Sequence, residues 1–234
     1  MKHPSTPKAA VRMARVAGLI YLLIAAFGAF AIAYVPSQII VAGDAQATFD
    51  QLQDRAGLFR AGMFADVFVI IAEIVLTAIL YVLLRPVDQV RSMIAAMARY
   101  AMVLVMAVNL MINVTAFMMS NGQLTGSPDT VLALFSIHAM GVYVWGILFG
   151  VHLWFLGSLV GQSGYLPRTL GGLMFIGAFG CVFEGLTKVT ALEITGLSWV
   201  VIGLLSIVTF AELAFAFWLL VRGLNVSRWE AVRA

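Results

Sequence analysis

Two acidic residues lie within a stretch of sequence that otherwise suits the interior of a membrane. The segment GMFADVFVIIAEIVLTAIL, residues 62–80, contains Asp66 and Glu73 seven positions apart. Seven steps of about 100° return a helix to nearly the same face, so both carboxylates share one side, about 10 Å apart along the axis. An ionised group at the centre of a bilayer costs about 2.5–3.5 kcal/mol. Both side chains should therefore face other polar groups or water.

Polar side chains recur at helical spacings in the other apolar segments. They are Arg99, Asn109, Asn113, His138, His152, Glu184, Lys188 and Glu212. Measured from the midpoint of each segment, the set divides by depth at 1.5 Å per residue. One half of the membrane should contain Asp66, Asn109, Asn113, His138, Glu184 and Lys188. The other half should contain Arg99, His152 and Glu212, with Glu73 near the centre. The spacing thus predicts two polar layers inside a helical bundle.

The first layer has the composition of a ligand pocket. A carboxylate and an imidazole at similar depth can hold a ligand or relay a proton. We expect Asp66 and His138 to lie in an outward-facing pocket that is floored by Glu73 and also lined by Asn109, Asn113 and Glu184. The leading hypothesis is a small or lipid-like ligand bound there. Purely structural roles are the alternative. The two asparagines could form hydrogen bonds between helices, and Glu184 could form an ion pair with Lys188, four residues later in the same helix.

The second layer is most simply structural. Arg99 and Glu212 lie at similar depth, so we expect an ion pair between them that joins two helices, with His152 close by.

Three other functions remain open at this point. A proton-linked carrier would use Glu73 as its central protonatable group, and a structural or accessory subunit would use the charges only to specify helix packing. An intramembrane metal hydrolase would need a site such as Asp66, His138 and Glu184. The chain contains only three histidines and no HxxxH or HExxH pattern. We therefore predict no metal and no cofactor and name no catalytic residue, and the sequence does not decide whether the protein is an enzyme.

The composition places these residues in a polytopic membrane protein. Of 234 residues, 62% are hydrophobic and 11% charged, with a mean hydropathy of +1.01, whereas soluble domains average about 25% charged. Six apolar runs are long enough to cross a bilayer as helices. They cover residues 16–35, 58–84, 92–119, 131–160, 169–190 and 196–222. We predict an all-α fold, a single six-helix domain at 16–222 with tails at 1–15 and 223–234.

The distribution of Lys and Arg predicts the orientation. Ten of these residues fall on one side of the predicted spans and three on the other, with Arg99 inside. We expect both termini of the protein in the cytoplasm. Its partners should be membrane lipids and the small or lipid-like ligand, not nucleic acid. The sequence leaves open a homo-oligomer or a membrane-protein partner.

Local signals refine this picture. Asp44 should cap a short amphipathic helix at 44–56 on the outer face.

The prolines fall at or between span boundaries, Pro36 among them, so we expect continuous helices. Gly146 and Gly150 form a small-xxx-small pair that would admit a neighbouring helix.

Several stretches carry a resemblance to a known family. They are RVAGLIYLLIAAFGAFA, VAGDAQATFDQLQ, LFRAGMFADVFVIIAEIVLTAILYVLLRPV and GVHLWFLGSLVGQSGYLPRTLGGLMFIGAFG. On the basis of these stretches, the chain resembles the bacterial membrane family known as domain of unknown function 4386. The resemblance extends from about residue 13 to residue 220. The resemblance implies an integral protein of the bacterial inner membrane and assigns no activity to any residue.

Overall fold

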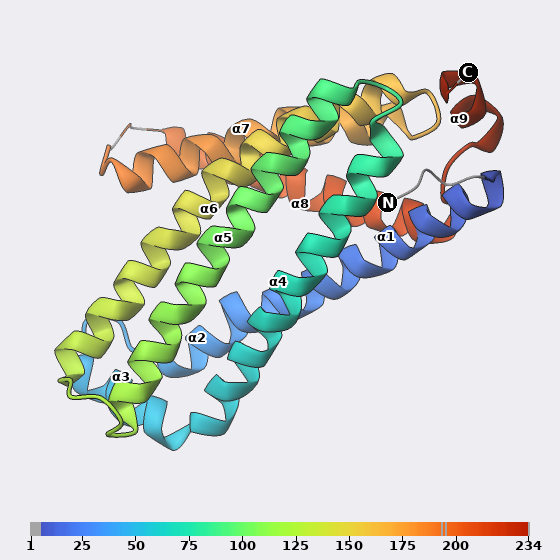
Figure 1. The fold of residues 1–234 in the computed structure, drawn as a ribbon. Coiled ribbons are helices and arrows are strands. Elements are labelled where there is room, and N and C mark those ends of the chain that lie inside the picture. The colour runs from blue at the N-terminus through green and yellow to red at the C-terminus, as the bar shows by residue number, and fades with distance from the viewer. Residues whose placement is uncertain (1–5, 193, 195, 234) are drawn as a thin grey trace.

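The computed structural model describes residues 6–192, 194 and 196–233, and over these residues it contains helices and no strand (Figure 1). The elements are α1 (Pro7–Gly28), η1 (Ala29–Tyr34), α2 (Val35–Ile39), α3 (Ala45–Asp54), α4 (Ala56–Leu84), α5 (Gln89–Ser120), α6 (Pro128–Ser163), α7 (Arg168–Val189), α8 (Leu197–Val221) and α9 (Val226–Arg233). Six helical segments in this part of the chain are long and apolar enough to cross a membrane, the first running without a break from Pro7 to Ile39. The predicted all-α fold of six transmembrane helices is confirmed.

Helices begin where the sequence supplies a capping side chain. Asp88 accepts from the backbone N–H of Arg91 at 2.9 Å to start α5, and Ser127 accepts from that of Thr130 at 3.2 Å to start α6. Each cap satisfies a backbone donor that has no partner within its own helix. At the other end of α6, Gly164 adopts a φ of +71°, which is a conformation that glycine reaches without strain.

The six long helices are packed in a closed order. α4, α5, α6, α7 and α8 each contact the next, and α1 closes the circuit by contacting both α8 and α4. The order is not a parallel bundle, however. In Figure 1, α4, α5 and α6 extend together toward the end that carries α3, whereas α7 and α8 diverge from them. α7 nevertheless packs closely against α6 as far as Gly185, where an added Cβ would lie 2.6 Å from the Tyr143 carbonyl oxygen, whereas α8 lies away from α6.

Small residues set the points of closest approach. A Cβ atom on Gly18 of α1 would lie 2.6 Å from the carbonyl oxygen of Ala216 in α8. One on Gly157 of α6 would lie 2.6 Å from the carbonyl oxygen of Gly171 in α7. Glycine at these crossings lets two backbones touch, which is the usual device for joining helices in lipid. The predicted close approach at Gly150 is also present, since a Cβ there would lie 2.9 Å from the Ala178 carbonyl oxygen of α7.

The short helix predicted at 44–56 is confirmed as α3. Asp44 caps it by accepting from the Ala47 N–H at 2.9 Å. Its apolar face is fixed to the end of the bundle by Leu52, which is fully buried, while Gln53 donates to the Ser120 carbonyl at 2.6 Å. Leu52 packs in one cluster with the ends of the spanning helices. This helix therefore covers the end of the bundle opposite the chain termini (Figure 1).

Pro36 lies inside the first spanning segment and not at the boundary that the sequence predicts, whereas the predicted continuity of the helix is confirmed. The first spanning segment continues through Pro36 to Ile39, and the six residues Ala29–Tyr34 that precede the proline adopt a π-helix. A proline lacks the N–H that would bond the carbonyl four residues earlier, here Ile32, and its ring crowds that carbonyl. A wider π turn accommodates the ring without breaking the helix. Backbone carbonyls of η1 are thereby freed from regular α-helical pairing.

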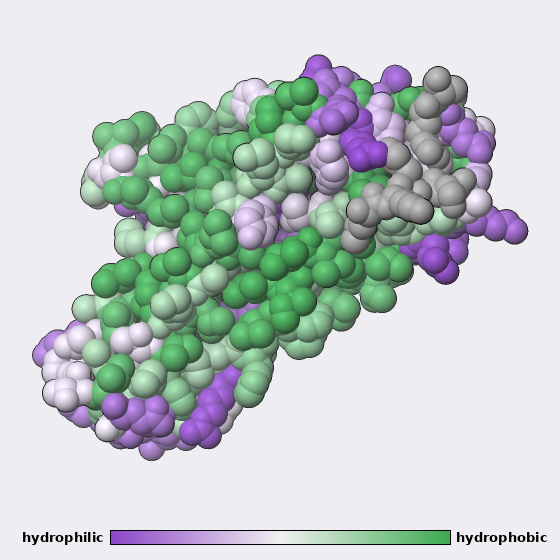
Figure 2. All heavy atoms as spheres, in the orientation of Figure 1, coloured by the Kyte–Doolittle hydropathy of each residue, from purple (hydrophilic) through white to green (hydrophobic). Residues whose placement is uncertain are grey.

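The surface has the distribution expected of a membrane protein. Figure 2 shows a broad hydrophobic zone between hydrophilic ends. Large apolar side chains are openly exposed in this zone, for example Phe64 at 75% and Trp199 at 78%. At the end that carries the termini, Arg15 donates to the Val221 carbonyl and Arg228 donates to the Gly164 carbonyl. These contacts join the N-terminal and C-terminal helices at the more basic end.

Candidate functional site

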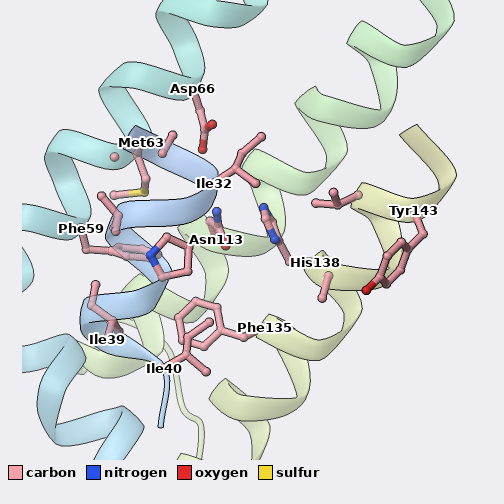
Figure 3. Close-up of a pocket in the computed structure, with 16 residues that line it drawn as sticks. Ile32, Ile39, Ile40, Phe59, Met63, Asp66, Asn113, Phe135, His138 and Tyr143 are labelled. Carbon is pink, nitrogen blue, oxygen red and sulfur yellow. The ribbon is translucent and has the colours of Figure 1, made fainter. Parts of the chain in front are cut away.

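A cavity of about 230 Å³ lies among η1, α2, α4, α5 and α6 (Figure 3). Four side chains with polar atoms line it, and these are Asp66, Asn113, His138 and Tyr143. The remaining lining is apolar and comprises Ala31, Ile32, Val35, Pro36, Ile39, Ile40, Phe59, Gly62, Met63, Phe135, Ala139 and Val142. The structure thus brings together Asp66 and His138, as the sequence predicts, and adds Asn113 from the helix between them. We call this cavity the Asp66 pocket.

The polar groups of the Asp66 pocket have no partners within the described part of the chain. The side chains of Asp66, Asn113 and His138 form no hydrogen bond or ion pair there, with each other or with any other residue. Arg60, the nearest cation along α4, lies instead over the ring of Phe117 at 5.2 Å. Polar side chains in membranes normally pair with protein groups or line wet cavities. These three are therefore available to a ligand or to water.

The pocket is closed toward α3 and open at the side. Ile39, Phe59 and Phe135 are at most 5% exposed and seal the end beneath α3. By contrast, Ile32 in the first spanning segment is 41% exposed, and Ile40, directly after the end of that segment, is 36% exposed. The accessible rim therefore consists of hydrocarbon side chains that face the region of the lipid tails.

Asn109 lies next to the pocket and acts chiefly between helices. It is buried, and its side-chain amide donates to the His138 carbonyl at 3.3 Å, which links α5 to α6. A small space of about 20 Å³ adjoins it, lined also by Asp66, His138 and Trp145. That volume suffices for about one water molecule. Asn109 thus forms a hydrogen bond between helices, which is the structural alternative for this residue. A water-sized gap separates it from Asp66.

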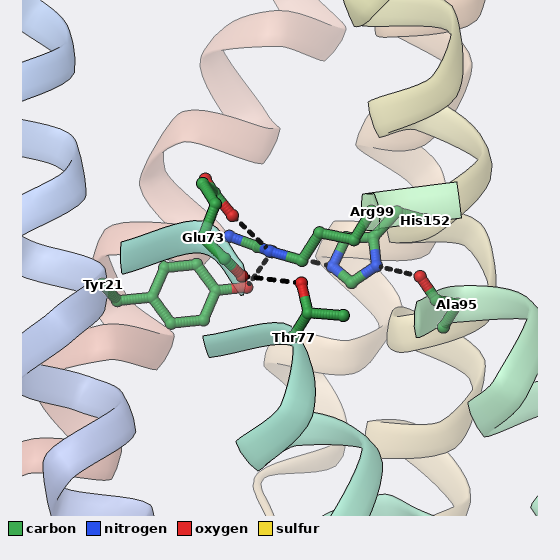
Figure 4. A network of polar contacts seen from close by, with 6 residues as sticks. All are labelled: Tyr21, Glu73, Thr77, Ala95, Arg99 and His152. Carbon is green, nitrogen blue, oxygen red and sulfur yellow. Dashed lines mark hydrogen bonds and ion pairs between the residues drawn. The ribbon is translucent and has the colours of Figure 1, made fainter. Parts of the chain in front are cut away.

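Glu73 does not floor this pocket, contrary to the prediction. Its carboxylate accepts from Arg99 Nε at 2.6 Å in a buried ion pair, and the two residues are 3% and 1% exposed (Figure 4). Arg99 also donates to the Tyr21 hydroxyl at 3.0 Å and lies with its Cζ 4.9 Å from the centre of that ring. Because Glu73 is held by a cation, it points away from the Asp66 pocket and joins α4 to α5 and α1.

The predicted ion pair between Arg99 and Glu212 is also wrong. Among the described residues, Arg99 forms its only ion pair with Glu73, and Glu212 forms none. Glu212 is close enough to interact electrostatically with Arg99 but is not in direct contact. Glu73 approaches the guanidinium more closely from α4 than Glu212 does from α8. The two predicted polar layers are also not separate, because Glu184 and Glu212 line the same groove.

His152 completes the buried network, and its partners fix its tautomer. Its Nδ1 lies 2.8 Å from the Ala95 carbonyl oxygen, which can only accept, so Nδ1 carries the proton. Its Nε2 then accepts from Arg99 Nη1 at 2.9 Å, as a neutral imidazole can. The network of Tyr21, Glu73, Arg99 and His152 is thus satisfied within the protein and joins four helices (Figure 4). We assign it to packing rather than to ligand contact.

Glu184 belongs to a different cavity from Asp66. It lines a groove of about 400 Å³ among α6, α7 and α8, together with Glu212. The predicted ion pair of Glu184 with Lys188 does not form among the described residues, since Lys188 lies exposed near the end of α7 while Glu184 lies one turn earlier against the groove. The set Asp66, His138 and Glu184 is therefore divided between two cavities. The described residues contain no group of three or more His, Cys, Asp or Glu side chains that could hold a metal ion.

The sequence reasoning missed two tyrosines and one backbone feature. Tyr21 binds Arg99, and Tyr143 lines the Asp66 pocket. Both lie within apolar spans, where a hydroxyl needs a partner, and this could have marked them. The π-helix beside the pocket could have been predicted from Pro36, because a proline within a continuing apolar run indicates a distorted helix and not only the end of a span.

Comparison with known proteins supports the family resemblance without adding an activity. A family described as "Domain of unknown function (DUF4386)" matches residues 16–223. An "Uncharacterized protein" of Archaeoglobus fulgidus is 34% identical over 161 residues, which cover 68% of this chain and 82% of the relative. No solved structure matches.

Proposed function

Because the chain belongs to the family described as domain of unknown function (DUF4386), whose description assigns no activity, we propose a function from the geometry of the site. The protein binds a small or lipid-like ligand in the Asp66 pocket. Asp66, Asn113 and His138 supply the polar contacts, and the apolar lining holds the rest of the molecule.

One observation carries this proposal: three polar side chains from three helices converge on one cavity without a partner among the residues that the structure describes. Leaving buried polar groups unpaired is expensive in an apolar surrounding. In the Arg99 network of the same bundle every titratable side chain is bonded to another protein group. The contrast within one molecule favours a ligand at the Asp66 pocket over a purely structural role.

The shape of the pocket favours a ligand that is only partly enclosed. Its volume of about 230 Å³ is below the roughly 300–1,000 Å³ of sites that enclose a drug-sized molecule. The open rim at Ile32 and Ile40 is apolar. A polar group could occupy the pocket beside Asp66 while an attached hydrocarbon chain remains among the lipid tails. Asp66 as a carboxylate would select a group that donates hydrogen bonds, such as an amine or a hydroxyl.

The π-helix adds support from the backbone. η1 contributes Ala31 and Ile32 to the lining, and π turns inside helices occur frequently at functional sites. The ion pair between Glu73 and Arg99 favours a binding protein over a carrier that uses Glu73 as its protonated group.

The proposal can be tested by comparing the molecules that copurify with variants. We expect mass spectrometry of wild-type protein, purified in a mild neutral detergent, to show a bound lipid or small amphiphile. Asp66→Asn and His138→Ala should each lower its occupancy by at least tenfold, because each removes a polar contact without filling the pocket. Addition of the recovered molecule should raise the thermal midpoint of wild type but not of either variant.

Asp54→Asn serves as the matched control, because Asp54 is exposed at the end of α3 and lies outside the pocket. It should retain wild-type occupancy. Equal occupancy in Asp66→Asn, His138→Ala and wild type, with all three folded, would contradict the proposal.

A further inference from the structure

The groove among α6, α7 and α8 is a second cavity, and it is distinct from the Asp66 pocket. α6 forms the wall between them, with Trp145 beside the water-sized gap on one side and the groove on the other. The groove measures about 400 Å³ and opens where α7 and α8 diverge from α6 (Figure 1). In Figure 2 a hollow separates the arm formed by the distal ends of α7 and α8 from the larger arm.

Backbone spacing creates this groove. Gly177 and Gly180 hold α7 against α8, since a Cβ on either would lie within 2.7 Å of Val208 or Leu204. Gly146 of α6, in contrast, faces open space: the nearest atom to an added Cβ would be the Cys181 carbonyl oxygen at 3.8 Å. α7 is thus packed tightly against α8, and it also approaches α6 closely at Gly185, where an added Cβ would lie 2.6 Å from the Tyr143 carbonyl oxygen. The groove therefore lies where α6 and α8 stand apart on either side of α7.

The groove contains two carboxylates and no cation to neutralise them. Glu184 of α7 and Glu212 of α8 line it, and no Lys, Arg or His does. Neither glutamate forms an ion pair or a side-chain hydrogen bond with the residues that the structure describes. Arg99 interacts with Glu212 at longer range, but its charge is already matched by Glu73 at 2.6 Å. Two acidic side chains therefore line an apolar groove without a cation in contact with either of them.

Aromatic rings complete the lining. Tyr143, Trp145 and Phe149 come from α6, and the rings of Trp145 and Phe149 stack with their centres 4.8 Å apart. Aromatic faces attract organic cations, most strongly where water is excluded. Leu205 and Val208 of α8 supply hydrocarbon on the opposite wall. Carboxylates combined with aromatic and aliphatic walls suit an ammonium group attached to an apolar body.

We propose that this groove binds a lipophilic organic cation. Its charged centre lies near Glu184 and Glu212, and its apolar groups lie against Trp145, Phe149 and Val208. The site takes its ligand from the membrane, because the flanking surfaces of α7 and α8 are apolar and exposed, for example Phe183 at 42% and Phe210 at 65%.

Binding of tetraphenylphosphonium to the full chain in lipid nanodiscs tests the proposal, with empty nanodiscs as background. We expect saturable binding of tetraphenylphosphonium, whereas tetraphenylborate, of the same shape and opposite charge and measured in a separate assay, should show no saturable binding above background. The double variant Glu184→Gln and Glu212→Gln should weaken tetraphenylphosphonium binding by at least tenfold. Glu230→Gln is the matched control, because Glu230 is exposed on α9, outside the groove, and should bind as wild type does.

A second variant keeps both charges and removes the space. Gly146→Leu would project a side chain into the groove, and we expect it to weaken binding by at least tenfold as well. Saturable binding of tetraphenylborate by itself, or unchanged affinity for tetraphenylphosphonium in both the double glutamine variant and Gly146→Leu, would overturn the proposal. Loss of binding in Asp66→Asn alone would also overturn it and would instead assign the cation to the Asp66 pocket.

Discussion

At the scale of single residues, the same chemical types have two different fates in this protein. Glu73 and His152 lie in a buried network in which Arg99 is the common donor. Asp66 and His138 offer the same pair of groups, but they face a cavity and have no protein partner in the described chain. A carboxylate or an imidazole therefore acquires its role here from whether a cation lies within reach.

Removal of Glu73 should show how strongly the buried pair holds the fold. Glu73→Ala leaves Arg99 unpaired, so we expect a loss of about 3–5 kcal/mol in the free energy of unfolding. Replacing both residues, with Arg99→Met and Glu73→Leu, should recover part of that loss because no buried charge remains. Unfolding in mixed micelles of neutral detergent and dodecyl sulfate would measure each variant.

The control is Arg91→Met, which removes an arginine from a solvent-exposed pair. Arg91 and Asp88 are 3.1 Å apart with side chains 41% and 31% exposed. Exposed pairs contribute at most about 1 kcal/mol. A loss in Glu73→Ala as small as that in Arg91→Met would show that the buried pair does not stabilise the bundle.

At the scale of elements, close contacts between helices depend on residues that leave the backbone uncovered. α1 and α8 touch at Gly18, while the π-helix farther along the same span widens the helix near the Asp66 pocket. One segment thus combines a tight crossing with a distorted turn. The tight crossing fixes the position of the first span, and the distorted turn shapes the cavity.

Two glycines in α1 provide a matched test of the crossing. A Cβ on Gly18 would lie 2.6 Å from the Ala216 carbonyl oxygen, whereas one on Gly28 would meet nothing within 4 Å. We expect Gly18→Ala to destabilise the protein by about 1–3 kcal/mol through overpacking. Gly28→Ala should stabilise it by up to about 1 kcal/mol, as alanine does in a helix interior. Equal effects in thermal or micellar unfolding would contradict the assigned crossing.

At the scale of the whole molecule, the even number of spans brings the two ends of the chain together. α1 contacts α9, and Arg15 reaches the end of α8 (Figure 1). α3 covers the opposite end. The excess of Lys and Arg lies at the end that carries the termini, which favours a cytoplasmic position for that end.

Cysteine labelling in intact cells would test this orientation. In a Cys181→Ala background, we expect a membrane-impermeant maleimide to label Gln46→Cys on α3 from outside. Lys8→Cys and Glu230→Cys should react only after permeabilisation, because the basic end is retained on the cytoplasmic side. The reverse pattern would invert the orientation, and with it the side from which the Asp66 pocket is reached.

The sequence by itself determined the six spans and the capping of α3 by Asp44, and it predicted a depth for each polar residue. Those properties depend on local hydropathy, local capping and a fixed rise per residue. They require no knowledge of neighbouring helices. The convergence of Asp66 and His138 on one cavity followed from their similar depth on facing helices.

Only the tertiary structure decided which side chains pair with each other inside the bundle. Glu73 and Glu212 were both near Arg99 in depth, and the choice between them depends on how α4 and α8 are rotated and tilted around it. Those angles are set by glycine crossings such as Gly18 with Ala216, which act between segments far apart in sequence. The same divergence of α7 and α8 from α6 placed Glu184 in a separate groove. Depth is a local property of the chain, whereas the direction in which a side chain points across the bundle is a property of the whole packing.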